Sequence, residues 1–219
     1  MSSKYPRTFH LNFSPGATND DKIASEEQIS NLLGKLIIIT EKIDGSNTSL
    51  EFDNCYARTH SGPPTHISFD GLKALHSTIK HKIPKDMQIF GEWCFALHSI
   101  FYDELPGYFL LFGVRELGEW GSWEEVELWA EELGVPTVPV LYKGIFNSMD
   151  ELKNKIMELV VQPSCFGKER EGVVIRNSAG FSDQNFAYNV IKWVRLGHVK
   201  TSTHWKNQKL TRNLLKKNA

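Results

Sequence analysis

The stretch "TEKIDGSNTSLEF" (residues 40–52) places a lysine, an aspartate and a glycine between two strand-like runs. The run that leads into it, "LIIIT", is apolar, and the run after the glycine, "NTSLEF", alternates between polar and apolar residues. An Asp-Gly pair between two such runs favours a tight hairpin turn. On that interpretation Lys42 and Asp44 are solvent-exposed turn residues. The stretch alone does not separate this structure from a reactive lysine held at a strand end.

Strand-like and helical segments extend outward from this stretch without strict alternation. Three serines, Ser25, Ser122 and Ser148, each stand three residues before Gln or Glu and predict helix starts, and "DGLKALHSTIKHK" predicts a fourth helix ahead of Pro84. The strand-like segments are "KLIIIT", "NTSLEF", "CYART", "MQIFGEW", "YFLLFGV", "GVVIR" and "YNVIKWV". Several are joined by turns too short for a crossover, so we predict an α+β fold with mainly antiparallel sheets flanked by helices.

Length and composition favour one ordinary globular domain spanning residues 1–219, with 41% hydrophobic and 23% charged residues. No run approaches the roughly 18 apolar residues of a membrane span, and the first ten residues lack the apolar segment of a signal peptide. A cytoplasmic protein without a membrane partner is therefore expected. The three cysteines are far apart and outside any C-x-x-C pair, so neither a disulfide framework nor a zinc site is indicated.

The net charge of −1 conceals an asymmetry. Residues 192–219 contain eight Lys or Arg and no Asp or Glu, whereas residues 1–191 have a balance of −9. A basic end on an acidic body favours contact with a polyanion, the alternative being a solvated terminal helix. We expect residues 1–24, which contain two prolines, to be an extended surface segment, and residues 196–219 to form a basic helix or tail.

A lysine that attacks a phosphate needs particular neighbours. Its ordinary pKa near about 10.4 must be lowered by burial or by other cations to give a free amine at neutral pH. The charge on the phosphate oxygens must be neutralised by Lys, Arg or Mg²⁺. The chain beyond Lys42 contains such a set, with further cations, carboxylates for a metal and an aromatic side chain for a base.

The order of these residues resembles that of the covalent nucleotidyltransferases, the superfamily of ATP-dependent DNA ligases, RNA ligases and mRNA capping enzymes. "EKIDGSN" resembles the nucleotidyl-acceptor motif, and "ARTHSG", "FGEWCF", "YFLLFGV", "EGVVIR" and "VIKWVR" resemble the following motifs in the family's order. The glutamate before the lysine and the Ser-Asn pair after the glycine are most similar to nick-sealing RNA ligases. The opening "YPRTFHLNFSPGATNDD" also resembles small bacterial and phage RNA-ligase-like proteins.

The resemblance implies a nucleotidyltransferase (ligase adenylation) domain and its first chemical step. Lys42 would attack the α-phosphate of ATP, expel pyrophosphate and hold AMP as a lysyl phosphoramide, while Lys192 neutralises the α-phosphate and lowers the pKa of Lys42. Asp44 would orient Lys42 or a reacting hydroxyl, although it also suits the turn itself. Glu171 would hold Mg²⁺ or Mn²⁺ by charge, the alternative being an ordinary acid at a strand start.

Five more positions are implied to bind the nucleotide together with Lys192. Glu41 would meet the adenine edge through its side chain, or be simply exposed. Arg58 and Ser61 would contact phosphate or sugar oxygens. Glu92, a carboxylate in the otherwise apolar "MQIFGEWCFAL", would bind a ribose hydroxyl, although strand alternation also permits it to face outward. Phe112 would stack on the base, whereas by residue type alone it is a core aromatic.

Two departures from the family pattern follow Lys192. The family's last motif commonly has a second lysine two positions later, and here that position is Val194. Arg195 could substitute for that lysine, but an adjacent strand residue points to the opposite face, which argues against the same phosphate contact. Only 24 residues follow Arg195, so the C-terminal OB-fold domain of larger ligases is not expected. A partner that supplies a nucleic-acid-binding domain is an open alternative.

The resemblance implies a stand-alone ATP-dependent RNA ligase. AMP would pass from Lys42 to a 5′-phosphate end, and a 3′-hydroxyl would displace it, at a nicked duplex or broken RNA ends. The basic tail would lie along the phosphate backbone through Arg195, Lys200, Lys206, Lys209 and Arg212. The alternatives are a capping-type guanylyltransferase, a small DNA ligase, and a non-catalytic nucleotide- or RNA-binding module, which Val194 and the short C-terminus favour.

Overall fold

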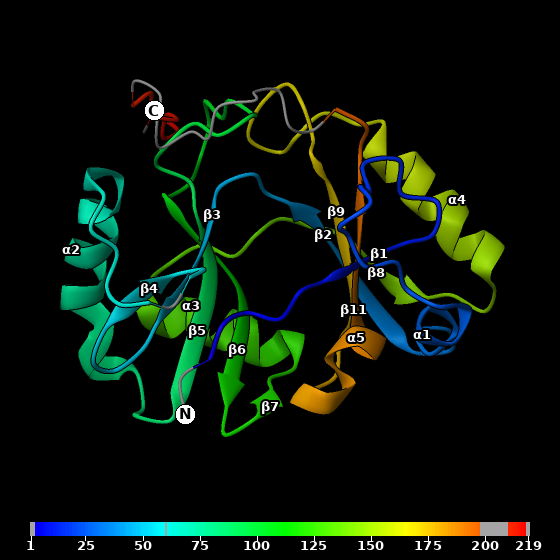
Figure 1. The fold of residues 1–219 in the computed structure, drawn as a ribbon, viewed down its shortest axis with the longest axis horizontal. Helices are drawn as coiled ribbons and strands as arrows, with labels where there is room; N and C mark the ends of the chain where they lie inside the picture. Colours follow the sequence, from blue (N-terminus) through cyan, green and yellow to red (C-terminus); the bar gives the residue numbers. More distant parts are fainter. Residues whose placement is uncertain (1–2, 60, 198–209, 218–219) are drawn as a thin grey trace.

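The structure is a computed structural model that describes residues 3–59, 61–197 and 210–217. In this part of the chain two β-sheets face each other, and helices lie against their outer sides (Figure 1). Every pair of neighbouring strands is antiparallel except β1 and β11. The predicted α+β fold with mainly antiparallel sheets is confirmed.

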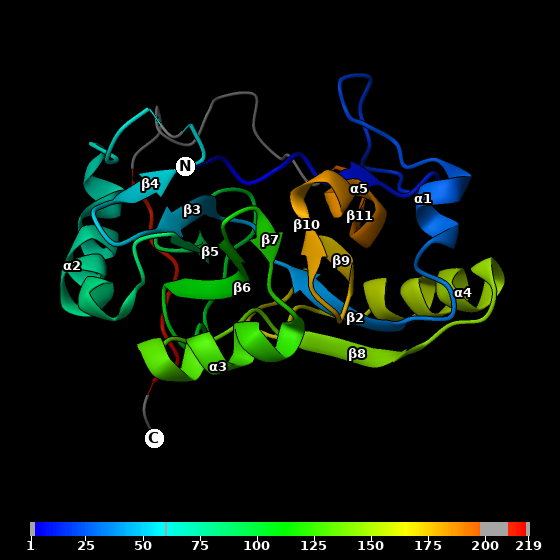
Figure 2. The same cartoon turned by 90° about the horizontal axis from the view of Figure 1, so that it is seen from below.

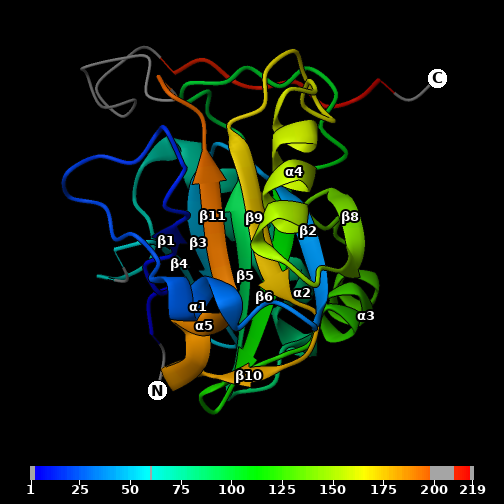
Figure 3. The same ribbon diagram turned by 90° about the vertical axis from the view of Figure 1, so that its right-hand side faces the viewer.

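The first sheet has the strand order β1 (Phe9–His10), β11 (Val190–Val194), β9 (Gly172–Asn177), β2 (Leu36–Lys42) and β8 (Val140–Ile145). Its outer face packs against α1 (Glu26–Ser30) and α4 (Met149–Val160) (Figure 3). Within β2, Ile37 and Ile39 join this outer core and Ile38 joins the core of the second sheet. The uninterrupted apolar run of β2 is therefore buried on both faces, as such runs are in central strands.

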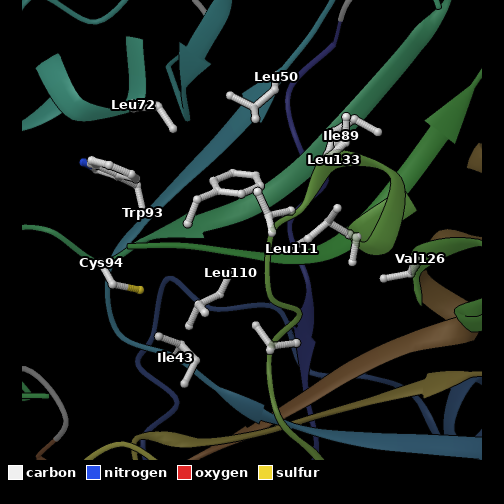
Figure 4. Close-up of a cluster of buried hydrophobic side chains, with 14 of the residues drawn as sticks. Ile43, Leu50, Leu72, Ile89, Trp93, Cys94, Leu110, Leu111, Val126 and Leu133 are labelled. Atoms are coloured by element: carbon white, nitrogen blue, oxygen red, sulfur yellow. The ribbon is translucent and has the colours of Figure 1, made fainter. Parts of the chain in front are cut away.

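The second sheet has the strand order β10 (Phe181–Ser182), β7 (Glu119–Trp120), β6 (Phe109–Glu116), β5 (Met87–Trp93), β3 (Ser46–Leu50) and β4 (Cys55–Ala57). The helices α2 (Asp70–Ile79) and α3 (Trp123–Leu133) flank it (Figure 2). Figure 4 shows side chains of its core, among them Trp93, Leu111 and Val126. A short helix, α5 (Phe186–Asn189), leads into β11.

Local signals fix the helix starts. Ser25, Ser122 and Ser148 cap α1, α3 and α4, each accepting a hydrogen bond from the backbone N–H three residues later. In α1 and α3 the third residue returns a side-chain hydrogen bond to the cap backbone, which completes the predicted capping box. The fourth predicted helix is α2, which passes into a 3₁₀ turn, Lys80–Lys82, ahead of Pro84. None of the helices in the described part of the chain has the length and apolar character of a membrane span.

The predicted hairpin after Lys42 is wrong. The strand that ends at Lys42 pairs with β8 and β9, whereas the strand that begins at Ser46 pairs with β4 and β5, so the intervening residues carry the chain from one sheet to the other. Ile43 is buried in the core of the second sheet, which anchors this crossing. A Cβ on Gly45 would lie 2.8 Å from the Trp93 carbonyl oxygen, so this glycine permits a close approach of two backbones rather than a hairpin turn.

The described part of the C-terminal tail differs from the expected helix. Residues 210–217 are extended and form isolated bridges, Arg212 with Ala96 and Leu215 with Leu105. Long-range main-chain pairing thus replaces the local hydrogen bonds that a helix would make. Residues 198–209, which include Lys200, Lys206 and Lys209, lie outside the described residues. At the other end, the extended N-terminal segment contributes the short strand β1, which pairs with β11.

Candidate active site

A cavity of about 990 Å³ lies between the two sheets. Strands of both sheets and the N-terminal segment line it. Six of the residues predicted from the sequence are among its lining residues: Glu41, Lys42, Arg58, Glu92, Phe112 and Lys192. A volume of this size is at the upper end of the range for small-molecule sites. The fold therefore gathers positions that lie up to 151 residues apart in the chain around one concave surface.

Lys42 and Glu171 form an ion pair at this cavity. Lys42 is the last residue of β2, and its register partner in β9 is Gly172, so Glu171 lies beside it. The Lys42 Nζ donates to both Glu171 oxygens, at 2.8 Å to Oε1 and 2.7 Å to Oε2. The side chain of Glu171 is only 6% exposed and that of Lys42 is 26% exposed. Removing either partner of a pair so little exposed to water leaves an uncompensated charge, which is costly.

The carboxylates around Lys42 reverse the expected direction of its pKa. Burial acts to lower the pKa of Lys42, but Glu171, Glu92 and Asp44 outweigh it and raise the pKa above its ordinary value. The effect of neighbouring cations is seen on Lys192 instead. Burial, Lys42 and Arg58 lower the pKa of Lys192 to about 8. The carboxylates therefore favour the protonated form of Lys42, whereas the sequence-based expectation was a lowered pKa.

Three hydrogen bonds hold the residues that follow Lys42. Asp44 Oδ2 accepts from the backbone N–H groups of Ser99 at 2.7 Å and Ile100 at 2.8 Å, and the Asp44 N–H donates to the Tyr102 hydroxyl at 2.9 Å. Asp44 thus ties the crossing between the sheets to the loop after β5. Both amide hydrogen bonds are to Oδ2, so they orient the backbone of this crossing and leave Oδ1 for a further contact.

Glu92 lies on β5 and faces the same crossing. Its Oε1 accepts a hydrogen bond of 3.2 Å from the Gly45 N–H. Burial raises the pKa of Glu92 to about 8, and the negative charges of Glu171 and Asp44 add to this rise against the opposing effect of Lys42. The buried carboxylate of "MQIFGEWCFAL" therefore has a backbone partner within the protein.

We expect Glu92→Gln to stabilise the nucleotide-free protein at pH 8 to 9. The folded-state pKa of Glu92, about 8, lies above the ordinary value, so ionisation of Glu92 reduces stability as pH rises toward and through 8. Glutamine keeps the acceptor for Gly45 and removes the charge. The expected gain is a few degrees in Tm, since about 1 kcal/mol shifts Tm by about 2–4 °C at this size. Thermal unfolding between pH 4 and 9 measures the gain, which should vanish near pH 4. Exposed Glu116 supplies the control Glu116→Gln, and a lower Tm for Glu92→Gln at pH 8 would contradict the account.

Phe112 contacts an N-terminal aromatic that sequence reasoning did not assign to the site. The ring of Tyr5 lies 5.1 Å from that of Phe112, at an interplanar angle of 78°, and 5.3 Å from each of the rings of Phe90, Trp120 and Phe186. Figure 1 shows the N-terminal segment crossing from the second sheet to β1. Burial raises the pKa of Tyr5 to about 12. The signal that pointed to this segment was the resemblance of "YPRTFHLNFSPGATNDD" to RNA-ligase-like openings.

Arg176 is a second cavity residue that the sequence did not reveal, because it follows the apolar run of β9, one residue before the strand ends. Burial lowers the pKa of Arg176 to about 10. Its guanidinium donates to the Gly121 carbonyl at 2.7 Å and the Phe112 carbonyl at 3.4 Å, and it lies over the rings of Trp123 and Phe181. It therefore adds a buried positive charge at the aromatic part of the cavity.

The side chains of two predicted nucleotide contacts, Glu41 and Ser61, have hydrogen-bond partners within the protein. Glu41 alternates with Lys42 along β2, and its carboxylate accepts from the Cys165 N–H at 2.9 Å and lies 3.6 Å from Arg170. Because neighbouring strand residues point to opposite faces, Glu41 lines the cavity with its backbone, and its carboxylate points away from Lys42. Ser61 is exposed, hydrogen-bonds to Thr59 at 3.2 Å, and does not line the cavity.

Val194 occupies the position of the family's second lysine. It is 1% exposed, and its backbone N–H and carbonyl both hydrogen-bond to the Ser14 hydroxyl, at 2.9 and 3.2 Å. Arg195 points elsewhere and forms an ion pair of 2.6 Å with Glu169. Arg212 is exposed on the extended C-terminal segment. The N-terminal segment thus packs on the end of β11, where the second lysine would stand.

The carboxylates present suit a cation that is bound partly by phosphates. Among residues 3–59, 61–197 and 210–217, no group of three or more His, Cys, Asp or Glu side chains could hold a metal ion by itself. Mg²⁺ usually takes one or two protein carboxylates together with phosphate oxygens and water. Glu171 is not among the lining residues, but it lies against Lys42 Nζ, which is, and its carboxylate is the type of ligand that Mg²⁺ or Mn²⁺ would take there together with phosphate oxygens.

Solved structures show the same fold in ligases. The ligand-free form of a Naegleria gruberi RNA ligase variant has a TM-score of 0.60 at 16% identity over 90% of this chain and 57% of that chain. An archaeal ATP-dependent RNA ligase gives 0.57 at 16% over 88% of this chain and 48% of the other. A putative ATP-dependent DNA ligase from Aquifex aeolicus gives 0.53 at 22% over 88% and 50%. The chain thus spans about half the length of these proteins.

Comparison at the level of sequence gives a family. No curated protein sequence matches the chain. The family model described as RNA ligase matches residues 35–194, which is most of the 219 residues and includes every predicted cavity residue from Glu41 to Lys192. The chain therefore belongs to the RNA ligase family.

Proposed function

We propose that this protein is an ATP-dependent RNA ligase that forms a lysyl-AMP intermediate on Lys42. The observation that carries the proposal is the position of Lys42 in the cavity wall, hydrogen-bonded to Glu171 and close enough to Lys192 to lower its pKa. One amine thus faces a cavity that also presents cations and a carboxylate. A second Naegleria gruberi RNA ligase variant, with TM-score 0.59, 16% identity and coverage of 91% of this chain and 58% of its own, was solved with ATP and Mn.

The proposed first step joins Lys42 to the α-phosphate of ATP. The neutral amine forms the P–N bond, the bond from the α-phosphorus to the bridging oxygen breaks, and pyrophosphate leaves. The proton that Lys42 must lose has an acceptor in place, because both Glu171 oxygens lie within 2.8 Å of Nζ. Mg²⁺ or Mn²⁺ held at Glu171 would supply charge neutralisation for the phosphate oxygens.

Lys192 and Arg58 are proposed to bind the phosphates, and Phe112 the base. Lys192 is on β11, with Val174 as its register partner, and Val174 is also the partner of Thr40 on β2. Thr40 and Lys42 are two residues apart on β2, so they point to the same face, and Lys192 shares this face with them. The two lysines therefore face the cavity from strands that are two apart in the sheet, which suits a phosphate that lies between them. The seal itself would follow by transfer of AMP to a 5′-phosphate end and its displacement by a 3′-hydroxyl. Arg195 and Arg212 are proposed to contact the strand backbone.

Nucleotide affinity should depend on the charge of Lys192. Its pKa of about 8 means that the ammonium is lost as pH rises above 8, so affinity for a non-hydrolysable ATP analogue should fall by about tenfold between pH 7 and 9.5. Lys192→Arg keeps its charge and should flatten this fall. Because Glu92 also titrates near pH 8, both proteins are compared in the Glu92→Gln background by calorimetry. Equal pH slopes for lysine and arginine would contradict the phosphate role of Lys192.

The choice of acceptor is tested with nicked duplexes. The protein is incubated with ATP and Mg²⁺ or Mn²⁺, and then with a 5′-phosphorylated nick in RNA or in DNA. The proposal predicts joined RNA, and label from ATP rather than GTP. Joining of DNA alone would favour a DNA ligase. The Aquifex aeolicus protein, a putative DNA ligase, has a similar fold. Label from GTP would favour a capping-type guanylyltransferase. RNA binding that weakens with salt, without label or joining, would leave a binding module.

A further inference from the structure

The C-terminal segment 210–217 is built into the half of the protein that carries the crossing after Lys42. It runs beside the loop that follows β5, residues 94–106, as Figures 1 and 3 show. Main-chain hydrogen bonds join the two along their length: Leu97 N–H to the Thr211 carbonyl at 2.8 Å, Leu214 N–H to the Tyr102 carbonyl at 2.9 Å, and Lys216 N–H to the Leu105 carbonyl at 2.8 Å. The segment thus supports the loop as an added strand would.

Asn213 is the centre of this contact. It is 0% exposed. Its Oδ1 accepts from the Tyr102 N–H at 3.0 Å, and its Nδ2 donates to the Cys94 carbonyl at 2.8 Å and to the Ala96 carbonyl at 3.5 Å. An amide can accept from one backbone group and donate to another at the same time, which neither a carboxylate nor an apolar side chain can do. Asn213 therefore closes the loop from residue 94 to residue 102 on itself.

The loop in turn holds the crossing that carries Lys42. Asp44 Oδ2 accepts from the N–H groups of Ser99 and Ile100, and the Asp44 N–H donates to the hydroxyl of Tyr102, which is 0% exposed. The backbone N–H of Tyr102 thus donates to Asn213, and the hydroxyl of Tyr102 accepts from the backbone N–H of Asp44. One residue, Tyr102, lies between Asn213 and Asp44, and both links are hydrogen bonds. Asp44 stands two residues after Lys42 in the chain, so the path reaches the backbone that carries Lys42.

We infer that Asn213 is a positioning residue for Lys42, acting through Tyr102 and Asp44. This inference rests on the proposed lysyl-AMP chemistry. A nucleophile displaced by about 1 Å can lose about 100-fold in rate, although its binding site for the substrate is intact. The segment 210–217 is then part of the machinery that aims Lys42, in addition to any contact that Arg212 makes with nucleic acid.

The test measures single-turnover lysyl-AMP formation in Asn213→Ala and in the milder Tyr102→Phe, which removes only the hydroxyl. At saturating ATP each rate should fall by about 10- to 100-fold, while the ATP concentration for half-maximal rate changes by less than about twofold. Because both variants break one chain of contacts, the double variant should be little slower than the slower single one. All rates are taken well below the Tm of each variant.

The control is His76→Ala. His76 is buried on α2 and hydrogen-bonds to the Glu51 carbonyl at 2.6 Å, so its loss should lower the Tm without changing the rate. Folded Asn213→Ala with the wild-type rate, or additive losses in the double variant, would overturn the inference while the proposed function stands. A wild-type protein that takes no label would overturn the proposed function, and the inference with it.

Discussion

Lys42→Ala should form no detectable lysyl-AMP, while its affinity for ATP changes by no more than a few-fold. The amine is the proposed nucleophile, so its removal stops the covalent step, whereas Arg58 and Lys192, the proposed phosphate-binding residues, still line the cavity. Loss of Lys42 also leaves Glu171 as a buried carboxylate without the partner seen at 2.7 Å, so a lower Tm is expected. The measurements are acid-labile label from α-labelled ATP, calorimetric binding of ATP, and thermal unfolding.

Lys143→Ala is the matched control. Lys143 lies on β8 of the same sheet as Lys42 and is exposed, so its removal should leave labelling unchanged. Label that persists in folded Lys42→Ala would show that another group accepts the nucleotide.

Glu171→Gln should change two properties of Lys42 in opposite directions. Glu171 is the strongest of the groups that raise the pKa of Lys42, so the amide variant should lower this pKa and increase the reactivity of Lys42 toward a small acylating reagent at pH 7.5. Lysyl-AMP formation should nevertheless fall by at least about 100-fold, because the variant loses both the proposed acceptor for the Lys42 proton and the proposed metal-binding charge. Peptide mass spectrometry measures acylation, and single-turnover labelling measures the enzymatic step.

Glu169→Gln is the corresponding control. Glu169 lies two residues away, is exposed and pairs with Arg195, so its substitution should change neither property of Lys42. If Glu171→Gln left Lys42 less reactive toward the acylating reagent, the ion pair would not be what holds its pKa up.

The elements that the sequence predicted correctly have strong local signals. Ser122 opens α3 because its hydroxyl satisfies a free backbone N–H, and Gly134 ends that helix with a φ of 64°, a conformation that glycine adopts readily. The apolar run of β2 predicted a strand whichever sheet it joins. The order of the motifs predicted that Lys42, Arg58 and Lys192 belong to one site, although no local rule places them together. All three line the cavity.

The features that the sequence did not predict depend on contacts between distant segments. The same local sequence, Asp-Gly after a strand, is compatible with a tight hairpin and with a crossing between sheets. The crossing is stabilised by burial of Ile43 in the second core and by the hydrogen bonds of Asp44. The residues around Asn213 adopt an extended form because the loop after β5 offers them hydrogen bonds. The direction of the Lys42 pKa likewise follows from a carboxylate 129 residues away.

The most direct test of the account is the location of the nucleotide on the wild-type protein. The chain is incubated with ATP and Mg²⁺ or Mn²⁺, digested, and mapped by mass spectrometry under conditions that preserve phosphoramides. The account predicts AMP on the peptide that contains Lys42, removed by added pyrophosphate and transferred to a nicked RNA with a 5′-phosphate. A protein that binds ATP but carries no AMP, or carries it on a residue other than Lys42, would contradict it.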